Sequence, residues 1–396
     1  MTAERYVHVT YPWRATIDAG SAHPARFYLA LIAQTLQGGA PASRPGGRVL
    51  AKVVRQGIPE RPLAALLRRG DRVLRGDRAP VVTADKASAR WDELRDADPT
   101  LPPAEHLSVL ELARASAVTT FVFGLSPTPL VVVKNARGTG EGVATEVAAL
   151  QEAAGTGLAP RYLGAFPDLG EVQRGLPGHA LAVRALTPRR AHELTWLPEH
   201  QAFADGILAL GRATRKPVVP EPACNGVVQQ ALTHPGLSPG TRRAVAEAEA
   251  ELERLEVSVL GHVDTSPQNI LYEGGRLSGL VDWADANTHG VPGADVLNAA
   301  MAYIELGVGL VRWDDRSLLG AFEGGYLRSE FGRSARAAAR ACAEAVGVPA
   351  ELAHSLELTF FARRLGWRMR APESFPTSAG LALRALERVR AEREST

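Results

Sequence analysis

The pattern of apolar and polar positions changes near residue 105. Upstream, apolar residues at helical spacing predict helices over 25–37 and 61–76, between stretches rich in Pro and Gly. Downstream, three short runs rich in β-branched and aromatic residues predict strands, and residues 160–178 predict two more. Between the first three and the last two predicted strands, a helical pattern covers 140–155, and the helix is expected to end at Gly155. The three earlier runs are 107–116, 119–125 and 129–136.

After about residue 180 the pattern is mainly helical, except over 257–283. Three amphipathic helical patterns close the chain, at 334–347, 351–371 and 380–394. This order predicts an α+β fold with a small antiparallel β-sheet, one helix packed with it, and a mainly helical second part. We divide the chain accordingly into a mixed, partly helical N-terminal extension of unknown role (1–104), a β-rich lobe (105–178) and a helical lobe (179–396).

The segment 261–272, GHVDTSPQNILY, holds the first candidate chemistry. It spaces His262, Asp264 and Asn269 as H-x-D-x-x-x-x-N and then enters an apolar run. An ordinary polar turn that leads into a strand could have the same pattern, so the motif alone is only suggestive.

The residues that follow give the motif a structural setting. Gly274 and Gly275 separate two apolar runs, which predicts a β-hairpin that ends at Asp282. Such a hairpin brings Asn269 and Asp282 to the same end, and carboxylate and carboxamide oxygens are ligands suited to Mg²⁺. Asp264 is then expected on the loop just outside this metal site.

Composition limits the compartment and the partners. The net charge of +2 indicates neither nucleic acid nor an anionic membrane as a partner. Two cysteines, Cys224 and Cys342, fit a reducing compartment better than a disulfide framework. There is no secretory h-region, and no apolar stretch reaches the roughly 18 residues of a membrane span. We therefore expect a cytoplasmic protein.

Asp264, Asn269 and Asp282 resemble the catalytic loop and metal-binding aspartate of protein-kinase-like phosphotransferases. The longer pattern HVDTSPQNILY…GLVDWADA…GADVLN is most similar to the aminoglycoside phosphotransferase and choline kinase branch. That branch commonly has H-G-D-x-x-x-x-N, and this chain has Val263 at the position of the glycine. The resemblance implies a two-lobed kinase-like fold, ATP (or GTP) and Mg²⁺ as cofactors, and phosphoryl transfer to a hydroxyl group.

The resemblance also implies a phosphate-binding Lys on a strand, paired with a Glu on the next helix. Lys134 follows four apolar residues and is one of only four Lys among 45 basic residues. Glu146 on the predicted helix is its expected partner, and Glu152 is the second candidate. The alternative for Lys134 is an edge-strand side chain in water. Ser116 and Thr119 are candidates to cover the β/γ phosphates in place of a glycine-rich loop, although a plain β-turn fits there as well.

The remaining candidates take their expected roles from the resemblance or from their own sequence setting. Asp264 would accept or orient the proton of the acceptor hydroxyl, and His262 would support the loop. Asp285 would face the acceptor or a second metal, or else cap the next helix. Asp295 would be an N-cap or an anchor of the loop. The purine is expected against the backbone of 171–177.

Three functions stay open. The first is an ATP-dependent kinase of a small molecule with a hydroxyl group, such as an aminoglycoside, a sugar or an amino alcohol. The second is a kinase of Ser or Thr in a peptide or protein, with residues 1–104 as a docking module. The third is a pseudokinase that binds a nucleotide and transfers nothing, against which the full set of expected residues argues. None of the three involves nucleic acid or a membrane.

Overall fold

The computed structural model describes residues 6–9, 14–18, 84–103, 107–113, 117–124, 128–136, 140–217, 225–311, 314–370 and 378–394. The chain forms two compact units. The first comprises Met1–Ala180, Gln268–Gly274 and Ser278–Asp285, and the second comprises Leu181–Pro267, Gly275–Leu277 and Ala286–Thr396. The helices predicted over 25–37 and 61–76 lie outside the described residues, as do Ser116 and Cys224.

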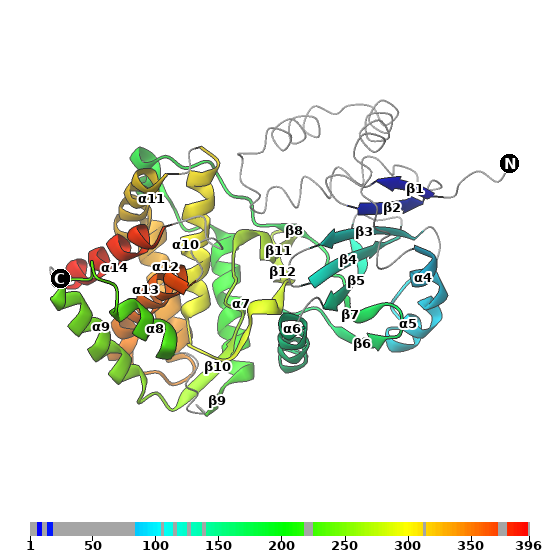
Figure 1. Cartoon of the computed structure of the whole chain (residues 1–396), viewed down its shortest axis with the longest axis horizontal. Helices are drawn as coiled ribbons and strands as arrows, with labels where there is room; N and C mark the ends of the chain where they lie inside the picture. The colour runs from blue at the N-terminus through cyan, green and yellow to red at the C-terminus, as the bar shows by residue number, and fades with distance from the viewer. Residues whose placement is uncertain are drawn as a thin grey trace. The chain divides into compact units, whose positions relative to one another are not determined.

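A seven-stranded antiparallel sheet forms the centre of the first unit (Figure 1), in the order β1-β2-β3-β4-β5-β7-β6. Strands β3 to β7 occupy the segments in which the sequence predicts strands. β1 and β2 extend the sheet from a region that we expected to be mixed and partly helical. The bounds are Tyr6–Val9 (β1), Arg14–Asp18 (β2), Ser108–Ala113 (β3), Ala117–Phe123 (β4), Pro129–Ala136 (β5), Tyr162–Phe166 (β6) and Gly170–Arg174 (β7).

The two faces of this sheet have different coverings, because successive side chains of a strand point to opposite sides. Val131 and Val133 of β5 are fully buried in a core with Trp91 and Leu94 of α5 (Trp91–Ala97), which follows α4 (Ala84–Ala89). Lys134 therefore points to the other face, where its side chain meets α6 (Glu141–Glu152). The core that contains Trp91 also includes Leu107 and Val109, so it has residues from both sides of the expected division between residues 104 and 105. That division stays a prediction.

The predicted hairpin is present. β11 (Ile270–Glu273) and β12 (Arg276–Leu280) lie next to each other in a three-stranded sheet with β8 (His179–Ala180). The turn residues Gly274 and Gly275 have φ of 57° and 79°. Two consecutive positive φ angles are the requirement of a tight hairpin turn, and glycine meets it without steric cost. The 3₁₀ turn η2 (Pro267–Asn269) precedes the hairpin and η3 (Trp283–Asp285) follows it.

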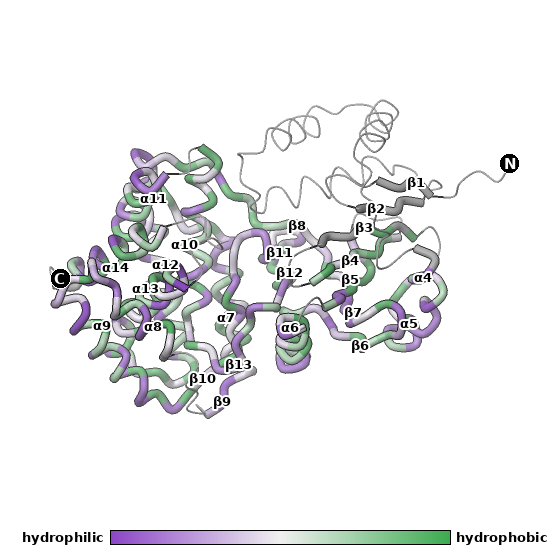
Figure 2. Tube along the Cα trace, in the orientation of Figure 1, coloured by the Kyte–Doolittle hydropathy of each residue, from purple (hydrophilic) through white to green (hydrophobic). Residues whose placement is uncertain are grey.

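The second unit is mainly helical, which together with the sheet of the first unit confirms the α+β fold class. Its short sheet has the order β13-β10-β9. Figure 2 shows apolar and polar residues alternating along its helices, as the amphipathic patterns predict. The strands are Lys216–Pro217 (β9), Val257–Gly261 (β10) and Asn287–Gly290 (β13). The α-helices are Pro198–Thr214 (α7), Asn225–Leu232 (α8), Pro239–Leu252 (α9), Ala294–Gly309 (α10), Asp315–Phe322 (α11), Glu330–Glu344 (α12), Ala353–Arg370 (α13) and Ala379–Glu394 (α14). The shorter segments are the 3₁₀ turns Pro188–Glu193 (η1) and Ala350–Leu352 (η5) and the π-helical Glu323–Arg328 (η4).

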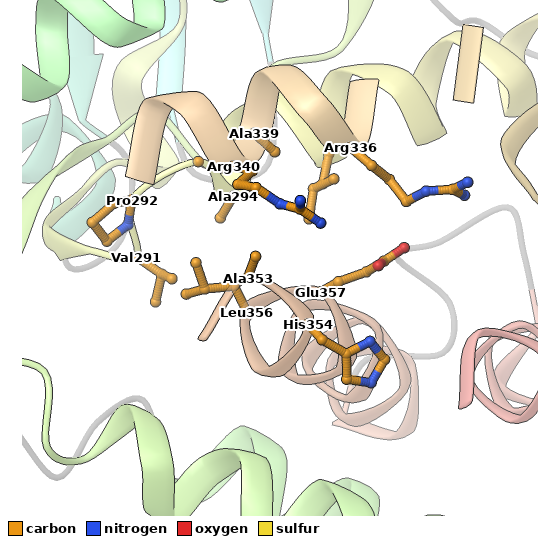
Figure 3. A pocket seen from close by; sticks show the side chains of 12 residues that line it. Val291, Pro292, Ala294, Arg336, Ala339, Arg340, Ala353, His354, Leu356 and Glu357 are labelled. Atoms are coloured by element: carbon orange, nitrogen blue, oxygen red, sulfur yellow. The ribbon is translucent and has the colours of Figure 1, made fainter. Parts of the chain in front are cut away.

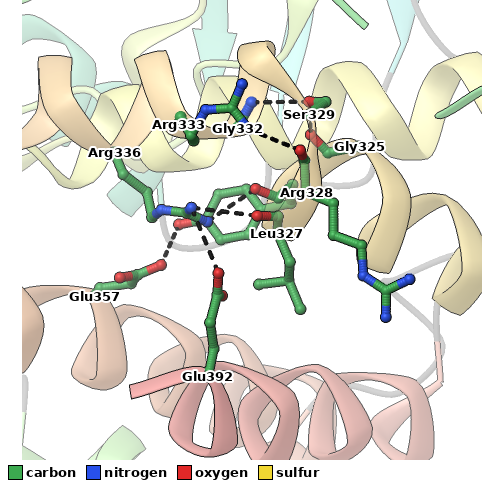
Figure 4. Close-up of polar contacts among 10 residues, drawn as sticks. Gly325, Leu327, Arg328, Ser329, Gly332, Arg333, Arg336, Glu357 and Glu392 are labelled. Atoms are coloured by element: carbon green, nitrogen blue, oxygen red, sulfur yellow. Dashed lines mark hydrogen bonds and ion pairs between the residues drawn. The ribbon is translucent and has the colours of Figure 1, made fainter. Parts of the chain in front are cut away.

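Arg336 and Tyr326 connect η4 with three of these helices (Figure 4). Arg336 of α12 donates to the backbone carbonyls of Tyr326 and Leu327 over 2.9 and 3.3 Å, and its guanidinium lies 5.3 Å from the centre of the Tyr326 ring. It also pairs with Glu392 of α14 at 3.7 Å. The Tyr326 hydroxyl donates to Glu357 of α13 over 2.8 Å. Both carbonyls belong to the last turn of the π-helical segment, where a helix supplies no N–H groups of its own, and the arginine satisfies them.

A buried histidine, His200, lies in an aromatic cluster of the second unit. The His200 ring lies among Trp196, Tyr303 and Phe331, with ring centres 4.9 to 5.5 Å apart within the cluster. Its Nδ1 accepts the backbone N–H of Leu197 over 3.1 Å. Burial lowers the pKa of His200 from 6.5 to about 4, against a weaker opposing effect of the nearby carboxylate on α7.

The fold is therefore expected to lose stability as the pH falls. Between pH 6.5 and 4 the unfolded chain binds a proton at His200 that the folded chain does not bind. At pH 4.5 this difference costs about 2–3 kcal/mol of unfolding free energy relative to pH 7. Denaturant titrations measure the unfolding free energy at pH 7 and pH 4.5. Between these two pH values, His200→Phe should lose about 2–3 kcal/mol less than the wild type. The exposed His192→Phe is the control, and equal losses in all three proteins would contradict the prediction.

Within the described residues, no helix combines the length and the apolar character needed to cross a membrane. Cys342 is buried in α12, where burial raises the pKa of its thiol to about 12.

Candidate active site

Lys134 forms the centre of an ionic cluster in the first unit. Its Nζ lies 3.1 Å from Oε2 of Glu146 on α6 and 3.0 Å from Oδ1 of Asp282, which follows β12. The predicted pair with Glu146 is present, and the alternative of a strand-edge Lys in water is wrong, because Lys134 is only 9% exposed. Glu152, the second candidate partner, lies at the end of α6.

The charges of this cluster do not balance. Burial lowers the pKa of Lys134, but the carboxylates of Asp282 and Glu146 raise it more, so that the pKa lies above its usual value. Lys134 is therefore charged at any physiological pH. Among these three described side chains, one ammonium faces two carboxylates, and the net negative charge of the three would attract a cation.

Gln173 of β7 is part of the cluster, and we did not predict it. Its Nε2 donates to Oε1 of Glu146 over 3.1 Å, and both side chains are buried. Each oxygen of Glu146 thus has a partner from the sheet, Gln173 for one and Lys134 for the other. In the register of β7 against β5, Glu171 is the direct partner of Lys134. Gln173 is two residues further along β7 and therefore lies on the same face as Lys134, which only this register shows.

The same face carries a row of polar residues across three strands. Thr119 of β4 and Glu171 of β7 are the direct cross-strand partners of Lys134. Thr119 is buried, in agreement with a side chain on the covered face. The Tyr162 hydroxyl donates to Glu171, and burial together with this carboxylate raises the pKa of Tyr162 to about 12. The predicted role of Thr119 over the phosphates stays a prediction.

Asn269 and Asp282 are brought together at the base of the hairpin. The backbone N–H of Val281 donates to the carbonyl of Asn269 over 3.0 Å, so the two predicted metal ligands stand on neighbouring backbone. Asp282 has a φ of 65°, a left-handed conformation that Asp tolerates better than most residues.

The donors of this pair fit Mg²⁺. One carboxylate and one carboxamide supply hard oxygen atoms, and Mg²⁺ commonly takes few protein ligands and completes its shell with phosphate and water oxygens. Among the residues that the structure describes, no group of three or more His, Cys, Asp or Glu could hold a metal by itself. A divalent cation at Asn269 and Asp282 would therefore depend on oxygens from a ligand.

Asp264 lies on a tight turn in the second unit, directly after β10. Its backbone N–H donates to the carbonyl of His262 over 2.8 Å, which leaves Val263 alone at the corner of the turn. Val263 has a φ of 69°, which for a β-branched residue costs on the order of 1–3 kcal/mol. The hydroxyl of Ser266 donates to Oδ1 of Asp264 over 2.9 Å and orients the carboxylate. The position of Asp264 beside the metal pair stays a prediction.

Asp295 anchors this turn. Its two carboxylate oxygens accept the backbone N–H groups of His262 and Val263 over 2.8 and 2.9 Å, and its carbonyl accepts the Thr265 hydroxyl over 2.7 Å. Of the two roles that the sequence allowed, the structure shows the loop anchor, because Gly293 occupies the N-cap of α10. Burial raises the pKa of Asp295, and His262 with the two backbone N–H groups opposes this effect. His262 is itself fully buried beneath the turn.

The cap role considered for Asp285 is wrong, because Gly293 is the N-cap of the next α-helix. Asp285 is exposed at the end of η3, and its possible roles toward an acceptor or a second metal stay predictions.

A separate cavity of about 130 Å³ lies in the second unit (Figure 3), between the start of α10, α12 and α13. Arg336, Arg340, His354 and Glu357 contribute its polar lining, and the other lining residues are mostly apolar. None of the predicted site residues lines it, so this cavity is not part of the candidate active site.

This chain is similar to known proteins both in sequence and in fold. The family model described as the phosphotransferase enzyme family matches residues 109–342. The similar solved structures include three at low identity. The first is a thermostable mutant of the aminoglycoside phosphotransferase APH(4)-Ia in a ternary complex with ADP and hygromycin B (14% identity, 71% of this chain, 92% of that chain, TM-score 0.43). The second is a choline/ethanolamine kinase family protein from Mesorhizobium loti (14%, 78%, 93%, 0.40). The third is choline kinase from Cryptosporidium parvum Iowa II (12%, 72%, 89%, 0.41).

No curated protein matches the chain significantly. The family model, in contrast, spans more than half of the sequence and includes Lys134, Asp264 and Asp282. It confirms the resemblance drawn from the H-x-D-x-x-x-x-N motif. The chain belongs to the phosphotransferase enzyme family.

Proposed function

We propose that this protein transfers the γ-phosphoryl group of ATP or GTP to a hydroxyl group of a small molecule, with Mg²⁺ as the metal. The observation that carries this proposal is the cluster of Lys134 with Glu146 and Asp282, in a member of the phosphotransferase family. A buried, charged Lys is a compact donor for phosphate oxygens, and a metal-binding aspartate beside it fits the same ligand.

The first unit would hold the nucleotide. Lys134 would donate to the α- and β-phosphates, and Glu146, fixed by Gln173, would keep its ammonium in place. Asn269 and Asp282 would hold Mg²⁺, which when bound neutralises phosphate charge. Thr119, together with Ser116, remains a candidate to cover the terminal phosphates, and the backbone of 171–177 would contact the purine.

The turn of the second unit would serve the acceptor. Asp264 would accept or orient the proton of the acceptor hydroxyl group. The oxygen of that hydroxyl group forms a bond to the γ-phosphorus, and the bond from the γ-phosphorus to the leaving oxygen of the diphosphate breaks. The proton passes to the carboxylate of Asp264, and the products are a phosphate monoester and a nucleoside diphosphate. Asp295 and Ser266 would keep the carboxylate oriented.

The acceptor is proposed to be an aminoglycoside, a sugar or an amino alcohol. The test is to incubate the full chain with ATP or GTP and Mg²⁺ and a panel of these compounds, together with Ser- and Thr-containing peptides. We expect a phosphate monoester of one small molecule and an equal amount of nucleoside diphosphate, both abolished by a chelator. A product with peptides alone would assign the protein to peptide kinases. Nucleotide binding without any transfer would favour the pseudokinase, and the absence of both would overturn the proposal.

A further inference from the structure

The strained turn before Asp264 needs an explanation of its own. Val263 has a positive φ, a conformation that suits the glycine common in this motif and not a β-branched residue. Burial of the side chain does not compensate, because Val263 is 42% exposed. A strained backbone of this kind persists only where the surrounding structure fixes it.

Helix α10 fixes both polar groups of the Val263 backbone. The N–H donates to Oδ1 of Asp295 over 2.9 Å, and the carbonyl accepts from Nδ2 of Asn298 over 2.7 Å. Asp295 and Asn298 are three residues apart and therefore lie on the same side of the helix, one turn from each other. The same Nδ2 also approaches the hydroxyl of Thr265 at 3.4 Å, so Asn298 reaches the turn on either side of Asp264.

Asn298 is in turn held from α13. Nη1 of Arg364 donates to Oδ1 of Asn298 over 2.9 Å, and Nη2 of the same guanidinium pairs with Glu305 of α10 at 2.5 Å. The side chains of Arg364 and Glu305 are only 14% and 16% exposed, so water and salt screen this ion pair little. Arg368 approaches the same carboxylate at 3.4 Å. The amide of Asn298 can therefore present its N–H₂ group only toward the turn.

We infer that Asn298, oriented by Arg364, is a positioning residue for Asp264: it holds the carbonyl of the strained Val263 and thereby fixes the direction of the catalytic carboxylate. This inference rests on the proposed function, because it takes Asp264 as the group that meets the acceptor. It predicts a specific coupling. If Asn298 is needed because Val263 is strained, then glycine at position 263 should make Asn298 dispensable.

Asn298→Asp tests the hydrogen bond from Asn298 to the Val263 carbonyl most directly. It keeps the size of the side chain and an oxygen for Arg364, but it places a second oxygen against the Val263 carbonyl, where the N–H₂ group was. With the best acceptor of the panel, we expect kcat to fall 10- to 100-fold and the KM for ATP to stay within about threefold. In a Val263→Gly background the same substitution should lower kcat less than about threefold relative to Val263→Gly alone. Leu386→Ala, which removes fully buried methyl groups of α14, is the control for a general loss of stability.

Amide hydrogen exchange supplies a readout that needs no turnover. Exchange at residues 262–265 should be at least about tenfold faster in Asn298→Asp than in the wild type, and the Val263→Gly background should abolish this difference. If Asn298→Asp does not fold, Arg364→Met replaces it in both measurements. The inference is overturned if the Asn298 variant matches the wild type, or if its defect is equally large with glycine at 263. If every protein is inactive on the whole panel, the proposed function fails, while the exchange rates still decide the positioning role.

Discussion

Asp264→Asn is expected to lower kcat by about 100- to 10,000-fold, the usual contribution of a positioned general base. The asparagine keeps an oxygen that can accept from the Ser266 hydroxyl, so the turn should retain its shape. What it loses is the ability to take the hydroxyl proton. Lys134 and Asp282, which we assign to the nucleotide, are unchanged, so the Kd for ATP should stay within about threefold of the wild-type value.

Single-turnover transfer and equilibrium nucleotide binding, measured on the same preparation, separate these two quantities. Asp205→Asn, on the exposed side of α7, is the matched control and should transfer at the wild-type rate. Transfer by Asp264→Asn at more than about a third of the wild-type rate would exclude Asp264 as the proton acceptor. A large loss of ATP affinity would instead assign Asp264 to the nucleotide.

Local patterns made much of the candidate site predictable. The Gly274-Gly275 turn folds the chain back between Asn269 and Asp282, so the hairpin and the proximity of these two residues follow from the sequence. The pair of Lys134 with Glu146 spans one strand and the next helix, and strand alternation with helical periodicity places both. These contacts depend on neighbouring elements and not on the packing of distant ones.

Contacts that depend on distant packing could not be predicted. Gln173 reaches Glu146 only because β7 pairs with β5 in one particular register. The contact of Asn298 with Arg364 requires the packing of α10 against α13, and a pattern of apolar positions does not fix which polar side chains meet there. Trp91 likewise shares the core of the sheet from a segment that carries no motif. Periodicity predicts which side of an element is buried, but not what covers it.

Lys134→Met is expected to affect both stability and activity, and the two effects can be separated. The substitution leaves the carboxylates of Glu146 and Asp282 side by side without the ammonium that they share. Removal of one partner from a buried ionic cluster typically costs about 3–5 kcal/mol of unfolding free energy. ATP binding should weaken at least about tenfold, because the phosphates lose a charged donor.

Two companion variants distinguish charge balance from nucleotide chemistry. Lys134→Met combined with Glu146→Gln removes one positive and one negative charge, so it should recover much of the lost stability but none of the ATP affinity. Lys134→Arg keeps the charge and should remain within about 1–2 kcal/mol of the wild type, yet transfer slowly, because a planar guanidinium cannot replace a compact ammonium beside two carboxylates. Denaturant unfolding and calorimetric ATP binding, carried out on each variant, measure both properties. Wild-type ATP affinity in the double variant would show that Lys134 serves the fold alone, and the nucleotide would then have to be assigned to other residues.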